Sequence, residues 1–84
     1  MSALHEAPYR LLLERIRAVR RSADITQEDL ALRLGTDQSF ISKYERGERR
    51  LDVVELRAVC IALGVDLLSF LADFERELKE KGLK

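Results

Sequence analysis

The stretch from Thr26 to Arg46 decides the fold of this chain, and it reads TQEDLALRLGTDQSFISKYER. The Thr26 hydroxyl can accept a hydrogen bond from an unpaired backbone N–H, and Asp29, three residues later, can complete a capping box. Gly35 follows the apolar residues of the first half and suits the positive φ that ends a helix. The pattern predicts a short helix over residues 26–34 and, after a tight break, a second helix over residues 37–46.

So short a break forces the two helices to cross steeply. The crossing requires a small side chain at the closest approach, which Ala31 supplies, while Ile41 and Tyr44 fill the space beneath the second helix. Glu45 is expected to support that helix through a salt bridge, either to Arg33 or to an arginine of the helix predicted over residues 9–22.

The opposite face of the second helix is polar and mostly uncharged, unlike an ordinary solvent-facing stripe rich in Glu and Lys. Glutamine can pair with adenine and lysine with guanine, whereas serine accepts or donates. At the start of the helix over residues 26–34, the Gln27 amide is well placed for a phosphate. Asp37 remains open between a helix cap and an acceptor for cytosine N4. The candidate base-reading residues are Gln38, Ser39, Ser42 and Lys43.

The remaining sequence predicts an all-α protein of five helices in one domain, because 84 residues suffice for a single domain. Residues 1–8 are expected to form a flexible arm and residues 82–84 a tail. Apolar residues at helical spacing predict further helices over residues 9–22, 53–63 and 67–81. The DNA-binding domain is therefore expected to span residues 9–81.

The charge and the reactive side chains limit the possible functions. The formal net charge is zero, with 15 basic and 15 acidic residues, so phosphate binding requires a local patch of arginines. His5 falls in the predicted arm and Cys60 in an apolar pattern, so no enzyme, metal or cofactor is expected. No signal peptide, membrane span or small-molecule site is evident, which favours a cytoplasmic, nucleoid-associated protein.

The run from Thr26 to Gly35, followed by Phe40-Ile41-Ser42-Lys43-Tyr44-Glu45-Arg46-Gly47, resembles the helix-turn-helix family of the lambdoid phage repressors and Cro. The resemblance extends over residues 10–71. Phe40 and the apolar residues 71–78 also resemble the family's restriction–modification controller branch. The resemblance implies a sequence-specific regulator of transcription, a repressor or autoregulator, that binds double-stranded DNA as a homodimer on an inverted repeat.

The resemblance also implies roles for individual positions. It places Gln27 against a phosphate, puts Gln38, Ser39, Ser42 and Lys43 at the bases, and assigns either Arg49 or Arg50 to a minor groove. The residues expected at the DNA backbone are Arg20, Thr26, Gln27, Arg46, Arg49 and Arg50.

The helix predicted over residues 67–81 carries more apolar surface than one small domain can cover. Leu71, Phe74 and Leu78 are therefore expected to form a homodimer interface. The same stripe supports an alternative, in which the chain is an antitoxin or interaction module that binds a foreign protein.

Overall fold

The computed structural model describes residues 3–83, which fold into five α-helices joined by short turns. The helices are α1 (Ala3–Ser22), α2 (Gln27–Leu34), α3 (Gln38–Glu45), α4 (Val53–Leu63) and α5 (Leu67–Glu80). No strand occurs within residues 3–83, and the predicted all-α fold of five helices is confirmed.

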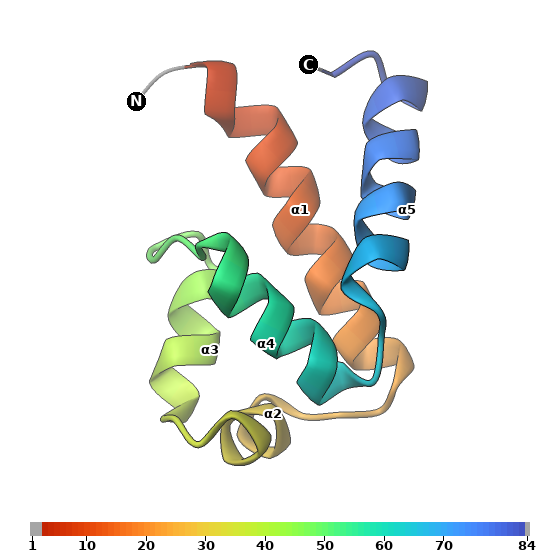
Figure 1. Ribbon diagram of the computed structural model, residues 1–84. Coiled ribbons are helices and arrows are strands. Elements are labelled where there is room, and N and C mark those ends of the chain that lie inside the picture. Colours follow the sequence, from red (N-terminus) through yellow and green to blue (C-terminus); the bar gives the residue numbers. More distant parts are fainter. Residues whose placement is uncertain (1–2, 84) are drawn as a thin grey trace.

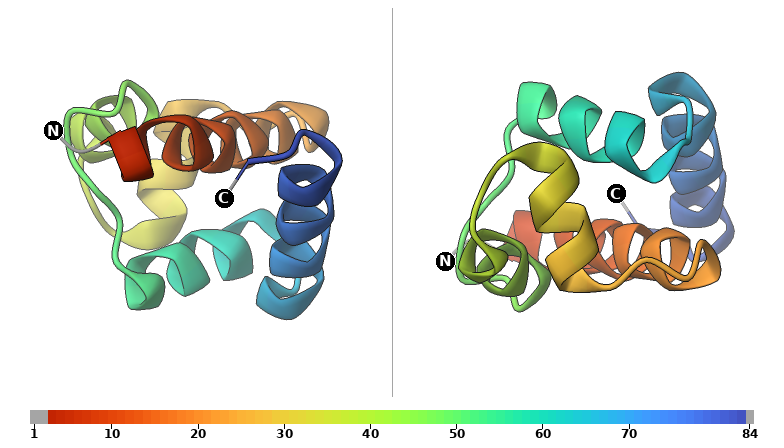
Figure 2. Two further views of the ribbon diagram at one scale, coloured as in Figure 1. Left: turned by 90° about the horizontal axis from the view of Figure 1, so that it is seen from above. Right: turned by 90° about the horizontal axis from the view of Figure 1, so that it is seen from below.

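The helices enclose the core from several sides (Figure 1). Seen from above and below, α1 and α4 form two opposite sides, α5 closes one end and α3 lies at the other (Figure 2). The α2 helix lies between α1 and α4, where it contacts both α3 and α4. The start of α1 and the end of α5 lie together at the end of the molecule away from α2.

Both arms of the predicted capping box fix the start of α2. The Thr26 hydroxyl oxygen accepts from the Asp29 N–H at 3.0 Å, and the Asp29 carboxylate accepts from the Thr26 N–H at 3.2 Å. Gly35 ends the helix with φ +69°, a value that L-residues with a side chain adopt at a cost. These two local signals set the length of α2 and the direction in which the chain enters α3.

The core lies where α1, α2, α3 and α4 meet, and α5 contributes Phe70 to it. Ala31 is 4 % exposed, as expected for a small residue at the helix crossing. The aliphatic and aromatic side chains around it supply the apolar burial that holds a domain of this size together. Six side chains are almost completely buried: Ile16, Leu30, Ile41, Tyr44, Val59 and Cys60.

The start of α1 differs from the sequence prediction. The helix begins at Ala3 and contains Pro8, whereas residues 1–8 were expected to form an arm. Pro8 is the sixth residue of the helix and lacks the N–H that would donate to the carbonyl four residues earlier, so the lost hydrogen bond belongs to the start of the helix. Residues 1, 2 and 84 and the side chain of His5 lie outside the described part of the chain.

Candidate nucleic-acid interface

The polar residues predicted on α3 gather on the side of the helix that faces away from the core. Gln38, Ser39 and Lys43 are exposed and Ser42 is half-buried. On the other side of the helix, Ile41 and Tyr44 are completely buried. The helix therefore presents hydrogen-bonding side chains to the surface and anchors itself through apolar ones.

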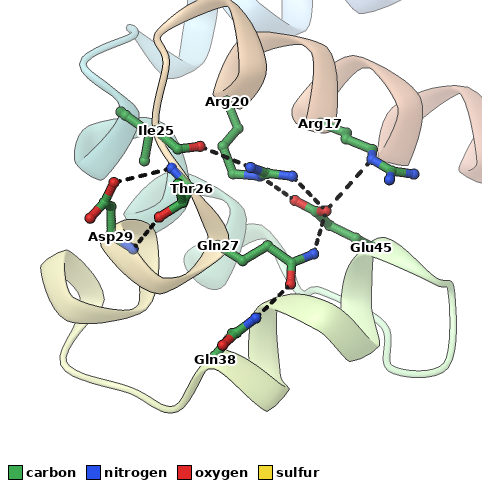
Figure 3. Close-up of polar contacts among 8 residues, drawn as sticks. All are labelled: Arg17, Arg20, Ile25, Thr26, Gln27, Asp29, Gln38 and Glu45. Atoms are coloured by element: carbon green, nitrogen blue, oxygen red, sulfur yellow. Dashed lines mark hydrogen bonds and ion pairs between the residues drawn. The ribbon is translucent and has the colours of Figure 1, made fainter.

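Behind this face, a buried ion pair joins α3 to α1 (Figure 3). The Arg20 Nε donates to Glu45 Oε2 at 2.7 Å, and its Nη2 donates to Glu45 Oε1 at 3.1 Å. The Arg20 Nη1 donates to the Ile25 carbonyl at 2.8 Å. The two side chains are only 8 % and 2 % exposed. The prediction that Glu45 pairs with an arginine of the first helix is confirmed, whereas Arg33 donates instead to the Ala62 carbonyl.

The burial of Arg20 contradicts its expected position at the DNA backbone. All three guanidinium nitrogens donate to partners inside the protein and the side chain is only 8 % exposed, so it offers little surface to a phosphate. Arg20 therefore positions Glu45 and is not a candidate for contact with the DNA backbone.

The Glu45 carboxylate also holds the two glutamines of the site. Gln27 Nε2 donates to Glu45 Oε1 at 2.9 Å, and Gln38 Nε2 donates to Gln27 Oε1 at 3.2 Å. A carboxylate can only accept hydrogen bonds, so the amide group of Gln27 must turn its NH₂ toward Glu45. Its carbonyl oxygen then faces Gln38, and the two side chains lie side by side at the surface.

Arg46 lies at the end of α3, between a serine of that helix and an acidic residue of the following turn. Its Nε donates to Glu48 Oε2 at 2.9 Å and its Nη2 to Glu48 Oε1 at 3.2 Å, while its Nη1 donates to the Ser42 hydroxyl. The hydrogen bond with Glu48 raises the pKa of Arg46, and the same contact lowers the pKa of Glu48. Arg46 is thus at the predicted edge of the site but already bound to an anion.

The two arginines of the α3–α4 connection also have partners within the protein. Arg49 forms two hydrogen bonds with the Glu55 carboxylate, at 3.0 and 2.7 Å, and its guanidinium lies 4.6 Å from the centre of the Phe40 ring. The guanidinium of Arg50 lies 4.3 Å from the centre of the Tyr9 ring. Both arginines are exposed, so both are within reach of a ligand.

Thr26 and Asp37 precede α2 and α3, but only Thr26 caps its helix through its side chain. Thr26 uses its hydroxyl oxygen as the cap of α2, yet its hydroxyl proton remains available to donate. Asp37 occupies the cap position of α3 without a capping hydrogen bond from its side chain. The structure therefore gives no support to Asp37 as a side-chain cap, which leaves its exposed carboxylate available to a ligand.

The sequence analysis missed Arg17. Its side chain is 49 % exposed and its Nε lies 3.8 Å from Glu45 Oε1, on the same carboxylate that holds Gln27. Helical spacing gives the missing signal, because Arg17 precedes Arg20 by three residues and so lies one turn away on the same side of α1.

The described residues contain neither a membrane-spanning helix nor a metal-binding cluster. None of the helices within residues 3–83 is long and apolar enough to cross a membrane. The same part of the chain contains no group of three His, Cys, Asp or Glu side chains arranged to hold a metal ion.

A family comparison agrees with this architecture. The profile of the helix-turn-helix family HTH_3 matches residues 16–70, which include the capped α2, the Gly35 turn and all of α3. The chain belongs to this family. As an XRE-type helix-turn-helix protein, it resembles the repressor-like domains indicated by its sequence, so the predicted family is confirmed.

Two relatives are similar to the chain in sequence. The chain is 38 % identical over 63 residues to an uncharacterized transcriptional regulator in the ATPase CF(0) region of Rhodospirillum rubrum; this match covers 75 % of the chain and 58 % of that relative. It is 29 % identical over 58 residues to the control protein C.MunI of a Mycoplasma species, covering 69 % of the chain and 78 % of C.MunI. The chain thus spans little more than half the length of the Rhodospirillum regulator.

Two solved structures superpose closely on this helix-turn-helix protein. An XRE-family like protein from Pseudomonas syringae pv. tomato has a TM-score of 0.84 and 45 % identity, covering 87 % of this chain and 89 % of that one. The restriction–modification controller protein C.Esp1396I, in a tetramer with its natural 35-base-pair operator, has a TM-score of 0.77 and 28 % identity. That match covers 93 % of this chain and 97 % of the controller protein.

Proposed function

We propose that this protein is a sequence-specific regulator of transcription that binds double-stranded DNA as a homodimer on an inverted repeat. The observation that carries the proposal is the chain of contacts from Glu45 through Gln27 to Gln38. It fixes two amide side chains from two helices on one exposed surface, beside the polar face of α3. Fixed donors and acceptors of this kind suit base edges in a major groove, which is wide enough to admit an α-helix.

Within this proposal, the exposed face of α3 reads the bases. Gln38 is held by its NH₂ group, which leaves its carbonyl oxygen free to accept from adenine N6 or cytosine N4. Lys43 is exposed and can donate to the acceptors of guanine. The exposed carboxylate of Asp37 can accept from cytosine N4. Ser39 and Ser42 complete the face.

Other side chains bind the phosphates that flank the bases. Thr26 and Gln27 lie at the start of α2, where the helix dipole favours an anion. The exposed arginines around α3 form a local basic patch in a chain whose formal net charge is zero. We assign contacts with the DNA backbone to Thr26, Gln27, Arg46, Arg49 and Arg50, and we add Arg17 to this group.

The dimer is supported by an apolar surface on α4 and α5. Val54 is 73 % exposed and Ile61 59 % exposed, and their spacing of seven residues places them on one face of α4. Large apolar side chains exposed together on one face of a helix suggest that a partner covers this face. On α5, Leu68 is 73 % exposed and shares a stripe with the half-buried Leu71 and Leu78. Phe74 is also half-buried, and Leu71 packs partly against the core.

A second copy of this chain is the partner that fits this surface best. An operator read by two modules requires two recognition helices about 34 Å apart, which one copy cannot supply. The controller protein C.Esp1396I was solved as a tetramer on its operator, and this supports self-association in the family. We therefore assign the surface to homodimerisation, with autorepression as the proposed outcome.

The first experiment measures binding of the purified protein to genomic fragments at several salt concentrations, including the fragment upstream of its own gene. The proposal expects a preference for one or a few fragments. Lys43→Ala should weaken binding several-fold, whereas Lys79→Ala makes the same charge change on the exposed side of α5 and should leave it unchanged. Equal binding to every fragment would refute the proposed function.

The second experiment measures the oligomeric state by light scattering. The wild type should be a dimer, and Val54→Asp should be a folded monomer because that side chain is largely exposed. The monomer should bind a full inverted repeat at least about tenfold more weakly, since it loses the linkage of two half-sites. A wild-type monomer that associates only with a foreign protein would refute the homodimer and favour the antitoxin alternative.

A further inference from the structure

Glu48 is an acidic residue inside an otherwise basic part of the surface. Its backbone N–H donates to the Lys43 carbonyl at 2.9 Å, which fixes the turn immediately after α3. From this position, its carboxylate accepts from both Nε and Nη2 of Arg46, at 2.9 and 3.2 Å. The carboxylate is therefore held against the guanidinium by the turn itself.

The contact has the geometry in which arginine also binds a phosphate. Two parallel N–H groups of one guanidinium edge donate to two oxygens of one anion. The remaining nitrogen, Nη1, donates to the hydroxyl of Ser42 on the proposed base-reading face. Glu48 thus occupies the two-donor edge formed by Nε and Nη2, and Ser42 takes one N–H of the remaining nitrogen.

We propose that Glu48 is an intramolecular competitor of DNA phosphate for Arg46 and so sets the strength of DNA binding. The proposal rests on the proposed function, because it concerns the same surface and the same ligand. To bind a phosphodiester through Nε and Nη2, Arg46 must give up the Glu48 carboxylate. The exchange releases a carboxylate near the DNA backbone, where it repels the phosphates.

The exchange is feasible because the pair is exposed. The side chains of Arg46 and Glu48 are 54 % and 56 % exposed, so water screens their attraction. The largest stabilisation typical of an exposed ion pair corresponds to about a fivefold change in an equilibrium constant. Neutralising Glu48 should therefore strengthen DNA binding about three- to tenfold, once the removed repulsion is added.

The test is a double-mutant cycle measured on one duplex that the wild type binds. Glu48→Gln keeps the shape of the side chain and removes its charge. The variants are Glu48→Gln, Arg46→Ala and the double variant, each checked for folding by circular dichroism. Glu80→Gln is the matched control, because it makes the same charge change on an exposed residue at the end of α5, far from α3.

Glu48→Gln should bind about three- to tenfold more tightly than the wild type and show a steeper salt dependence, by up to about 0.9 in the slope. The gain should be at least threefold smaller when Arg46 is replaced, and Glu80→Gln should change binding less than about twofold.

No gain for Glu48→Gln, or the same gain with and without Arg46, would overturn the inference and leave the proposed function standing. A wild type that prefers no DNA sequence would overturn both.

Discussion

The buried pair of Arg20 and Glu45 allows the stability of the domain to be separated from its proposed DNA binding. We consider Arg20→Met, Glu45→Met and the double variant, since methionine fills similar space without a charge. Removing one partner of a buried ion pair leaves an uncompensated charge and typically costs about 3–5 kcal/mol. Replacing both partners with apolar residues is often nearly neutral.

The structure predicts that the two single variants are unequal. After Arg20→Met, Glu45 keeps the hydrogen bond from Gln27 and lies 3.8 Å from Arg17, so the loss should be about 3 kcal/mol. After Glu45→Met, the Arg20 guanidinium keeps only the Ile25 carbonyl and stays buried, so the loss should be about 5 kcal/mol. A domain of this size has a total free energy of unfolding of about 4–13 kcal/mol, so a loss of about 5 kcal/mol removes a large part of its stability.

Urea unfolding followed by far-UV circular dichroism measures these losses. The double variant should recover to within about 2 kcal/mol of the wild type, which gives a coupling energy of several kcal/mol. The recovered double variant should nevertheless bind DNA at least about tenfold more weakly, because Gln27 has lost its acceptor. Single losses below about 1 kcal/mol, or losses that simply add in the double variant, would refute the account of the buried pair.

Three further predictions concern stability and reactivity. Tyr44→Phe should raise the free energy of unfolding by about 1 kcal/mol and the Tm by about 4–8 °C. The reason is that the buried Tyr44 hydroxyl has no hydrogen-bond partner among the described residues. An unchanged or lower Tm in a thermal melt would contradict this prediction. The hydrogen bond from Arg49 lowers the pKa of Glu55 to about 2, below its unfolded value, so its stabilisation is present above about pH 4.3 and is lost as the pH falls toward 2. The Tm of Glu55→Gln should therefore depend less on pH across that window than the Tm of the wild type. An equal pH dependence of the two proteins would count against the ion pair of Arg49 with Glu55. Burial raises the pKa of the Cys60 thiol, which is 2 % exposed, so a thiol reagent should react slowly in buffer and rapidly in urea; equal rates would mean that the core opens readily.

The sequence predicted α2 to α5 well because local signals mark their ends. Thr26 with Asp29, and Asp52 with Glu55, form capping boxes that are complete within four residues of sequence. The α1 helix was predicted to start six residues too late. Its beginning lies before a proline, and a proline within the second turn of a helix looks in sequence like the start of that helix.

The sequence predicted that Glu45 pairs with an arginine of the first helix, but it could not identify which arginine or most of the other side-chain contacts. Arg20 looked like the other arginines of its helix, and only the three-dimensional fold brings Glu45 from 25 residues away to pair with it. Glu48 gave no signal either, because its contact with Arg46 depends on how the chain turns after α3. On α4, the sequence analysis did not single out Val54 and Ile61, and the structure shows both to be largely exposed.

The hydrogen bond between Gln27 and Gln38 changes how variants of the two residues should be interpreted. From sequence alone, Gln27→Ala should weaken binding to every DNA site equally, and Gln38→Ala should change the preference at one base pair. In the structure, Gln38 donates to Gln27, so removing Gln27 also frees the residue proposed to read that base pair. Gln27→Ala should therefore reduce both affinity and discrimination at that position, by part of the roughly 1–3 kcal/mol that one base contact contributes. Binding to a set of single-base operator variants measures this directly, with Lys79→Ala as the control. A Gln27→Ala protein that loses affinity equally for every variant would show that the two glutamines act independently once DNA is bound.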